Sequence, residues 1–493
     1  MKRALLILLL LFIPFTLIMA KVNFNGAYES SFTFIRDNQE YKWQLASPWH
    51  RLELRFYADP IPNTEFFLKT YADSWRTTAD SDRKEAFYLD EGHIKYRWGD
   101  SDYIESFLFV RETRFWLGDP LLNLVNNDYD KWDDKKVSGL TYEMNGFLPG
   151  FWSKFFITKM VDSDIDNAGI RVYEKLLKNN VHIGSTITYK KWQGSKNYYN
   201  SVYAGDLWVG IIKKVLNLTG EAGISRTPTL ITDKNDVLAC KIEVKGDRPL
   251  QALLNKNIGS LSYRLGYRDI GNDFRAYLSK DYDNDRKFDQ IGYDLNVQYL
   301  FPIKAITLKY YRDYYKRHYE NYQVNDNQLE AYIEFIKGFR WKNYYQIYHE
   351  LNTDRIQITQ LDGSVIEVNF VDNTWQHYLT QLEMENSIAY VKLQFKIKNI
   401  YTEYLKYLYG TEYSINITQK LKSINRLIII DEGNRARKTF FSQIQYRYGE
   451  NTDFYLGYGE ESDSNDDLVN DDNFVEGDNN IVHKAHLYVK VGF

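Results

Sequence analysis

The sequence predicts an all-β fold: a transmembrane antiparallel up-and-down β-barrel of 18–24 strands. Three observations predict it, namely an apolar leader, repeated segments in which apolar and polar residues alternate, and a final strand that ends in Phe493. Tyrosine, phenylalanine and tryptophan supply 42, 28 and 11 of the 493 residues, against only 9 prolines. Aromatic residues favour strands, so the composition agrees with the alternation.

Residues 1–20 have the composition of a secretory signal peptide. Met1-Lys2-Arg3 is basic, the run from Leu5 to Met19 is mostly apolar, and Ala20 precedes a polar segment. We therefore predict export and cleavage after Ala20. The alternative is an uncleaved membrane anchor, for which the apolar run is short. The mature chain, residues 21–493, is expected to form one outer-membrane β-barrel domain.

Alternation with a period of two predicts strands that have one apolar and one polar face. In residues 291–299 the odd positions are Ile, Tyr, Leu, Val and Tyr, whereas positions 294, 296 and 298 are Asp, Asn and Gln. The same period runs through residues 50–58, 91–98, 261–268 and 389–398. Such strands bury the apolar face against a second sheet or turn it toward lipid.

Connection lengths favour the membrane barrel over a soluble sandwich. Brief connections are expected at residues 59–63, 99–102, 301–304, 422–423 and 449–451, and longer polar ones at 118–135, 271–287, 351–372 and 461–480. Short periplasmic turns opposite long external loops are typical of outer-membrane barrels. Residues 22–493 contain 24 candidate strands, an even number that suits a closed barrel with both ends in the periplasm.

The last eleven residues carry a family resemblance. They alternate so that Leu487, Val489, Val491 and Phe493 share the outward face. Together with the signal peptide, a terminal strand that ends in phenylalanine resembles bacterial outer-membrane β-barrel proteins, and broadly the porin-like barrels related to alginate-export channels. The resemblance covers the mature chain as architecture, and no motif links it to one subfamily. It implies a place in the outer membrane and recognition of the Phe493 strand by the barrel-assembly machinery.

Tyrosine-rich strands fit the aromatic girdles that such barrels carry at the two membrane interfaces. We expect Tyr310, Tyr311, Tyr314 and Tyr315 there. The alternative makes these rings sugar-stacking platforms along a pore.

The pore is expected to be narrowed by a loop. The first strand is expected near residues 22–34, directly after the leader, which argues against an N-terminal plug and for a passive channel. The segment 115–127 is unusually apolar for an external loop and follows Arg111 and Arg114. We predict that the loop 117–135 folds inward and that both arginines lie near the constriction. The alternative is that it packs over the outer rim or caps a neighbouring strand. The alternation changes phase near Arg111, which predicts a bulge.

Basic residues outnumber acidic ones on the polar faces of the clearest strands. The pore-lining and constriction residues are predicted to be Arg55, Arg97, Arg111, Arg114, Lys241, Arg264, Arg268, Lys309 and Lys396. Rows of inward Lys and Arg favour anions in a pore. In the alternative, acidic and basic residues on adjacent strands neutralise each other. The net charge of -4 is compatible with a basic lumen because acid gathers in loops such as 460–478.

Other classes of protein are disfavoured. A single cysteine, Cys240, excludes a disulfide framework and cysteine metal sites. Asp281, Asp283 and Asp285 place carboxylates at alternate positions, as a calcium-binding loop does. However, Arg286 stands where that loop needs glycine. We therefore expect no metal and no cofactor, no enzymatic activity, and no nucleic-acid partner.

We predict an outer-membrane channel for passive diffusion of small hydrophilic, anionic solutes. One alternative keeps the barrel and makes it an export or uptake channel for acidic polysaccharide. Another makes it a structural or adhesive barrel. The expected partners are outer-membrane lipid, the assembly machinery, and small anions or acidic oligosaccharides. Monomer and homotrimer both remain open.

Overall fold

The computed structural model describes most of residues 22–493. The described ranges are 22–36, 42–45, 49–59, 61–75, 84–112, 116–125, 137–160, 165–192, 199–212, 215–227, 236–247, 259–272, 274–279, 289–303, 305–318, 321–352, 356–359, 365–368, 371–400, 405–431, 433, 436–459 and 483–493. The predicted signal peptide lies outside the described residues.

Strands make up nearly all of the described secondary structure. Their bounds are β1 Val22–Arg36, β2 Trp43–Leu45, β3 Trp49–Ala58, β4 Thr64–Trp75, β5 Lys84–Trp98, β6 Tyr103–Glu112, β7 Val137–Asn145, β8 Phe151–Met160, β9 Ile165–Leu176, β10 Val181–Trp192, β11 Tyr199–Ile212, β12 Leu216–Arg226, β13 Val237–Asp247, β14 Ser260–Ile270, β15 Gln290–Leu300, β16 Ile306–Lys316, β17 Tyr322–Ile336, β18 Phe339–Asn352, β19 Ile356–Thr359, β20 Val365–Val368, β21 Val371–Glu385, β22 Ala389–Ile400, β23 Lys406–Asn416, β24 Leu421–Asp431, β25 Ala436–Tyr448, β26 Thr452–Gly459 and β27 Lys484–Gly492. One 3₁₀ turn, Leu177–Asn179, joins β9 to β10. In the described part of the chain, no helix is long and apolar enough to cross a membrane.

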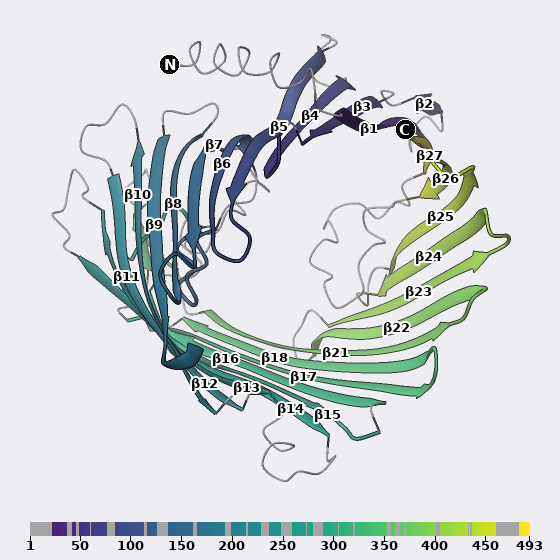
Figure 1. The fold of residues 1–493 in the computed structure, drawn as a ribbon. Coiled ribbons are helices and arrows are strands. Elements are labelled where there is room, and N and C mark those ends of the chain that lie inside the picture. The colour runs from purple at the N-terminus through teal and green to yellow at the C-terminus, as the bar shows by residue number, and fades with distance from the viewer. Residues whose placement is uncertain are drawn as a thin grey trace.

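The strands close into a barrel of 24 (Figure 1). Each strand from β3 to β18 and from β21 to β27 pairs antiparallel with its neighbour in the chain, and β1 pairs with β3 on one side and β27 on the other. The closing register runs from Ala27 opposite Gly492 to Ile35 opposite Lys484. The short β2 pairs with the end of β1, and β19 and β20 form a separate hairpin. The predicted all-β, up-and-down barrel and its 24 strands are confirmed.

Short connections gather at one end of the barrel, which we call the short-turn end. β1 begins and β27 ends there, and the turns between β3 and β4, β5 and β6, and β17 and β18 belong to it. The β17–β18 turn is only Lys337-Gly338, with Gly338 at φ 83°, where a Cβ would meet the Glu385 carbonyl oxygen at 2.1 Å. Only glycine suits that position.

One predicted turn is wrong. Residues 422–423 lie inside β24, and the chain turns at residues 417–420 instead. The Thr418 hydroxyl accepts hydrogen bonds from the Lys420 and Leu421 amides at 3.1 and 3.0 Å. A threonine that bonds the backbone two and three residues on is a turn signal, and it marks the correct position.

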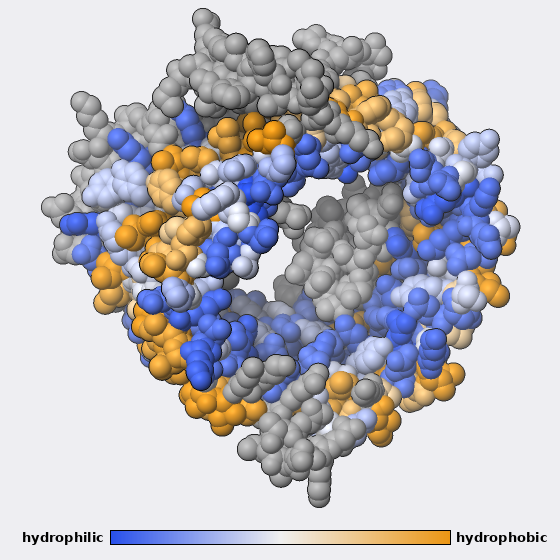
Figure 2. All heavy atoms as spheres, in the orientation of Figure 1, coloured by the Kyte–Doolittle hydropathy of each residue, from blue (hydrophilic) through white to orange (hydrophobic). Residues whose placement is uncertain are grey.

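Apolar side chains face outward and polar ones face the lumen. On β13, Leu238 and Ile242 are exposed on the outer surface, whereas Lys241 and Glu243 point inward. Figure 2 shows this arrangement as hydrophobic residues around the outside and hydrophilic residues around a hollow centre. The tyrosines of β16 follow the same alternation, so Tyr310 and Tyr314 face outward and Tyr311 and Tyr315 face the lumen.

Two buried apolar clusters form on the inner wall where two connecting segments fold back into the barrel. Residues 116–125 follow β6, and residues 271–272 and 274–279 follow β14. The predicted bulge near Arg111 is present as a shift of register between Phe109 and Glu112 in the pairing of β6 with β7. β6 ends at Glu112, directly after this shift.

Candidate functional site: the inner wall of the barrel

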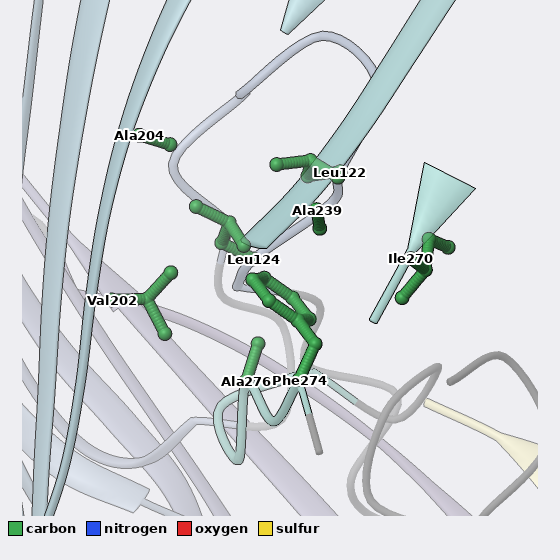
Figure 3. Close-up of a cluster of buried hydrophobic side chains, with 8 residues drawn as sticks. All are labelled: Leu122, Leu124, Val202, Ala204, Ala239, Ile270, Phe274 and Ala276. Carbon is green, nitrogen blue, oxygen red and sulfur yellow. The ribbon is translucent and has the colours of Figure 1, made fainter. Parts of the chain in front are cut away.

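The segment 116–125, which we call the inner loop, is docked on the wall by apolar packing. Leu122 and Leu124 are fully buried (Figure 3). They belong to a cluster with Val202, Ala204, Ala239, Ile270, Phe274 and Ala276, contributed by β11, β13, β14 and the segment after β14. For the described residues 116–125, the predicted inward fold is confirmed and the alternative position over the rim is wrong; residues 126–135 lie outside the described residues, and the predicted constriction stays a prediction.

A second cluster holds the two ends of the inner loop. Leu117 and Val125 are buried against Phe109 of β6, Phe156 of β8 and Leu278. Phe109 and Phe156 face inward on their strands, and Phe107 of β6 packs against the same cluster. Burying an apolar side chain of this size contributes about 1.5–3 kcal/mol, so both ends of the loop are fixed.

Polar contacts anchor the centre of the inner loop. The Oε2 atom of Glu221 on β12 accepts hydrogen bonds from the Leu121 and Leu122 amides at 2.7 Å each. The Lys241 Nζ atom on β13 donates to the Leu121 carbonyl at 3.0 Å. Within the loop, Asp119 Oδ2 accepts from the Leu124 amide at 2.7 Å. Lys241, predicted as a pore-lining residue, thus holds the loop.

The second inner segment, residues 271–279, was expected to belong to a polar external loop. It is instead tied to the wall by three side chains. Asn200 and Ser225 donate to the Arg275 carbonyl at 3.0 and 2.5 Å, and Lys190 Nζ donates to the Tyr277 carbonyl at 2.8 Å. Phe274 and Ala276 complete the cluster around Leu122. In the sequence, the alternation of the apolar residues Phe274, Ala276 and Leu278 is the signal for this inward position.

Three of the predicted lining residues are half-exposed and ion-paired. Arg264 Nη2 lies 2.8 Å from Asp294 Oδ2, and Lys309 Nζ lies 2.7 Å from Glu330 Oε1. Arg55 pairs with Glu53 on its own strand.

The other predicted residues take different places. Arg97 lies 3.7 Å from the centre of the Tyr103 ring and donates to the Asp100 carbonyl at 3.2 Å. Arg268 donates to Gln290 and Asp313. Lys396 is buried, 1% exposed. Arg111 belongs to β6, but its side chain lies outside the described residues, as does the whole of Arg114.

Ion pairs between neighbouring strands line much of the wall. Further inward pairs are Lys69–Asp90, Lys154–Glu143, Arg340–Glu383, Lys342–Glu330, Lys392–Glu412 and Arg426–Glu412. The alternative left open by the sequence, in which acidic and basic residues on adjacent strands neutralise each other, is therefore present along the wall. Several acidic partners, such as Glu412, lie on clearly alternating strands, whereas Glu383 lies on a strand where polar residues occupy both faces and does not stand out in the sequence.

In several ion pairs the two members are not equally exposed. In seven pairs the cation is 33–56% exposed and its carboxylate only 14–21%. The pairs are Arg55–Glu53, Lys95–Glu105, Lys245–Glu243, Arg264–Asp294, Lys309–Glu330, Arg447–Asp453 and Lys490–Glu29. All seven cations lie toward the short-turn ends of their strands. We call them the cation ring.

Among the described residues, no group of three or more His, Cys, Asp or Glu side chains is placed to hold a metal ion. The calcium-like stretch 281–285 lies outside the described residues.

No family model and no curated protein sequence matches this chain. Solved structures match it in fold. The chain resembles the siderophore receptor PirA from Pseudomonas aeruginosa, with 10% identity and a TM-score of 0.49 over 95% of this chain and 80% of that one. It resembles the translocation pore of the P pilus usher PapC with 7% identity and a TM-score of 0.46, over 95% and 99%.

A third match is a chain of the E. coli P pilus tip assembly intermediate PapC-PapD-PapK-PapG. It has 8% identity and a TM-score of 0.57, over 95% of this chain and 60% of that one. At such identities the likeness concerns the fold alone. The chain is a large closed β-barrel that resembles outer-membrane proteins.

Proposed function

We propose that the chain is an outer-membrane channel through which small hydrophilic solutes diffuse passively, with a preference for anions. The observation that carries the proposal is a hollow, closed barrel with a polar inner wall and a cation ring at its short-turn end.

Membrane placement follows from the two faces of the barrel. An outward charged side chain at the bilayer midplane would cost about 2–4 kcal/mol for Arg or Lys. The ion pairs of the cation ring all point inward, while residues such as Leu238 and Ile242 face outward. In this orientation the short turns lie in the periplasm and the long connections lie outside the cell.

The preference for anions follows from the unequal exposure of the paired groups. A passing ion would meet Lys245 and Arg264 more readily than Glu243 or Asp294, because the two cations are more exposed. A unit charge about 4 Å away in water contributes on the order of 1 kcal/mol. Because each cation has a carboxylate behind it, we expect a mild preference rather than exclusion of cations.

The experiment is a reversal-potential measurement on refolded protein in a planar bilayer under a KCl gradient. The native channel should prefer chloride. The double substitution Lys245→Gln and Arg264→Gln should move the reversal potential toward the cation side. A matched control, Lys392→Gln with Arg426→Gln, removes two cations that share Glu412 but are only 13% and 16% exposed. It should shift the potential less.

Two outcomes would refute the anion preference. One is a cation-selective native channel, and the other is an equal shift in the two double variants. Both variants should first be shown to fold, by the heat-dependent change in gel migration that closed barrels display.

A linear polyanion is the second candidate solute, because the cation ring would also suit the repeating carboxylates of an acidic polysaccharide. In that case uronate oligomers should block the small-ion current, and neutral oligomers of the same length should not.

A further inference from the structure

We call the polar groups that hold or lie near the inner loop its anchor: Asp119, Glu221, Asp206, Arg171 and Lys241. The anchor has three carboxyl groups and two basic groups. Arg171 of β9 forms a bidentate pair with Asp206 of β11, at 2.7 and 3.1 Å, and its charge is thereby matched. Lys241 of β13 is the other basic group of the anchor; it lies opposite Glu221 of β12 in the strand pairing and donates to the Leu121 carbonyl. Two further carboxyl groups bind the same loop, Asp119 and Glu221. If both were ionised, the anchor would carry one uncompensated negative charge.

Two carboxyl oxygens in this anchor have no hydrogen-bond partner. They are Asp119 Oδ1 and Glu221 Oε1, both shielded from solvent. The residues are 9% and 2% exposed. An unpaired buried charge is costly, and so is a buried oxygen without a donor. One additional proton would supply both the missing donor and the missing positive charge.

The two carboxyl groups accept hydrogen bonds from neighbouring backbone amides of the inner loop. Glu221 accepts from the amides of Leu121 and Leu122, and Asp119 accepts from the amide of Leu124. The charge of Asp119 also acts directly on Glu221. A proton held between them would therefore sit where the inner loop meets the wall.

We infer that Asp119 and Glu221 share one proton, and that this proton latches the inner loop to the wall of the channel. The inference rests on the proposed channel function for its consequence but not for the latch itself. Deprotonation leaves two anions against one amine, which weakens docking and favours release of the loop from its apolar cluster into the passage.

The sign of the pH dependence follows from burial. Burial raises the pKa of the Asp119 carboxyl above its usual range, although the Leu124 amide and the Arg171 guanidinium act in the opposite direction. A raised pKa means that the docked loop binds the proton more tightly than the released loop does. Docking is thus favoured at low pH and weakens as the pH rises through the pKa of the docked state.

Other charged groups around the loop are already engaged. Lys190 of β10 donates to the Tyr277 carbonyl, and the Arg275 guanidinium donates to the carbonyls of Asn272 and Phe274. Arg171 and Asp206 bind each other. The Asp119–Glu221 pair is therefore the part of the anchor whose charge a proton would change.

The test measures docking directly, without current. Leu124→Cys is introduced with Cys240→Ser, and the rate of modification by a charged methanethiosulfonate is followed from pH 5 to pH 9 in the full refolded chain. The rate is divided by that of Leu148→Cys, an exposed short-turn residue, which removes the effect of thiol ionisation. The ratio should be low at pH 5 and rise by at least about tenfold by pH 9, the change that one pKa unit produces.

Glu221→Gln provides the decisive comparison. Its amide oxygen can accept from Leu121 and Leu122 while its NH₂ donates to Asp119 Oδ1, as the shared proton would. The ratio should stay low at every pH. Glu243→Gln, on the same wall but paired with Lys245, should keep the native profile. Leu122→Cys repeats the measurement if Leu124→Cys does not fold.

A pH-independent ratio in the native background would overturn the latch. A Glu221→Gln profile that matches the native one would do so as well. Because the readout is labelling, neither result depends on whether the barrel conducts, and a non-conducting barrel with a pH-dependent ratio would refute only the channel.

Discussion

The barrel closes on a contact between Gly26 and Phe493. The two residues exchange backbone hydrogen bonds at 2.9 and 3.1 Å. A Cβ at Gly26 would lie 2.8 Å from two atoms of the Phe493 ring and 2.5 Å from the Glu53 carbonyl oxygen. The terminal aromatic residue therefore lies where the first strand has no side chain.

Gly26→Val should weaken this seam. Overpacking typically costs about 1–3 kcal/mol, so the temperature at which the folded band disappears on a gel should fall. Gly220→Val is the matched control, because a Cβ there would meet nothing within 4 Å. Equal loss of thermal resistance in the two variants would contradict the role given to the Phe493 ring.

Arg171→Met should destabilise the barrel through Asp206. Both side chains are 5% exposed, so the substitution leaves a buried carboxylate without its guanidinium. Removing one partner of a buried pair costs about 3–5 kcal/mol, measurable as a lower urea midpoint. Lys245→Met breaks an exposed pair and should cost no more than about 1 kcal/mol. A similar midpoint for the two variants would count against this account.

At the scale of elements, we expect conduction through the lumen to depend on where the inner loop lies. Leu122→Asp should release it, because a carboxylate cannot be buried among Val202, Ala239 and Phe274 without a partner. We expect a channel with greater current noise, since the freed loop enters the passage. Leu148→Asp, in an exposed turn, should conduct as the native channel does. A quiet Leu122→Asp channel would show that the loop has no part in conduction.

The strands and the inner loop were predictable because their signals are local. Alternation identifies a strand from its own residues, and the apolar character of residues 116–125 shows that this loop is poorly suited to water. The segment 271–279 was not predicted to fold inward, because its anchors Asn200, Ser225 and Lys190 are distant in the sequence. The ion pairs depend on strand register, which a single strand does not reveal. The difference in exposure between the cations of the ring and their carboxylate partners depends in turn on those pairs.

At the scale of the whole molecule, the balance of charge decides selectivity. Lysine and arginine total 62 and aspartate and glutamate 66, so the whole chain does not favour anions. The proposed anion preference rests instead on the cation ring, whose basic side chains are more exposed than their acidic partners.

Such a surface effect should be screened by salt. The Debye length falls from about 10 Å at 0.1 M to about 3 Å at 1 M. The chloride preference should therefore be measurable under a gradient centred near 0.1 M KCl and nearly vanish near 1 M. A preference that does not change with salt would place selectivity at a buried site instead of the cation ring.

The most direct test of the central claim is the single-channel conductance of the refolded native protein in a planar bilayer. We expect discrete, stable conductance steps in symmetrical KCl from a barrel whose heat-dependent gel migration shows that it is folded. A folded and inserted barrel that never conducts would contradict this claim.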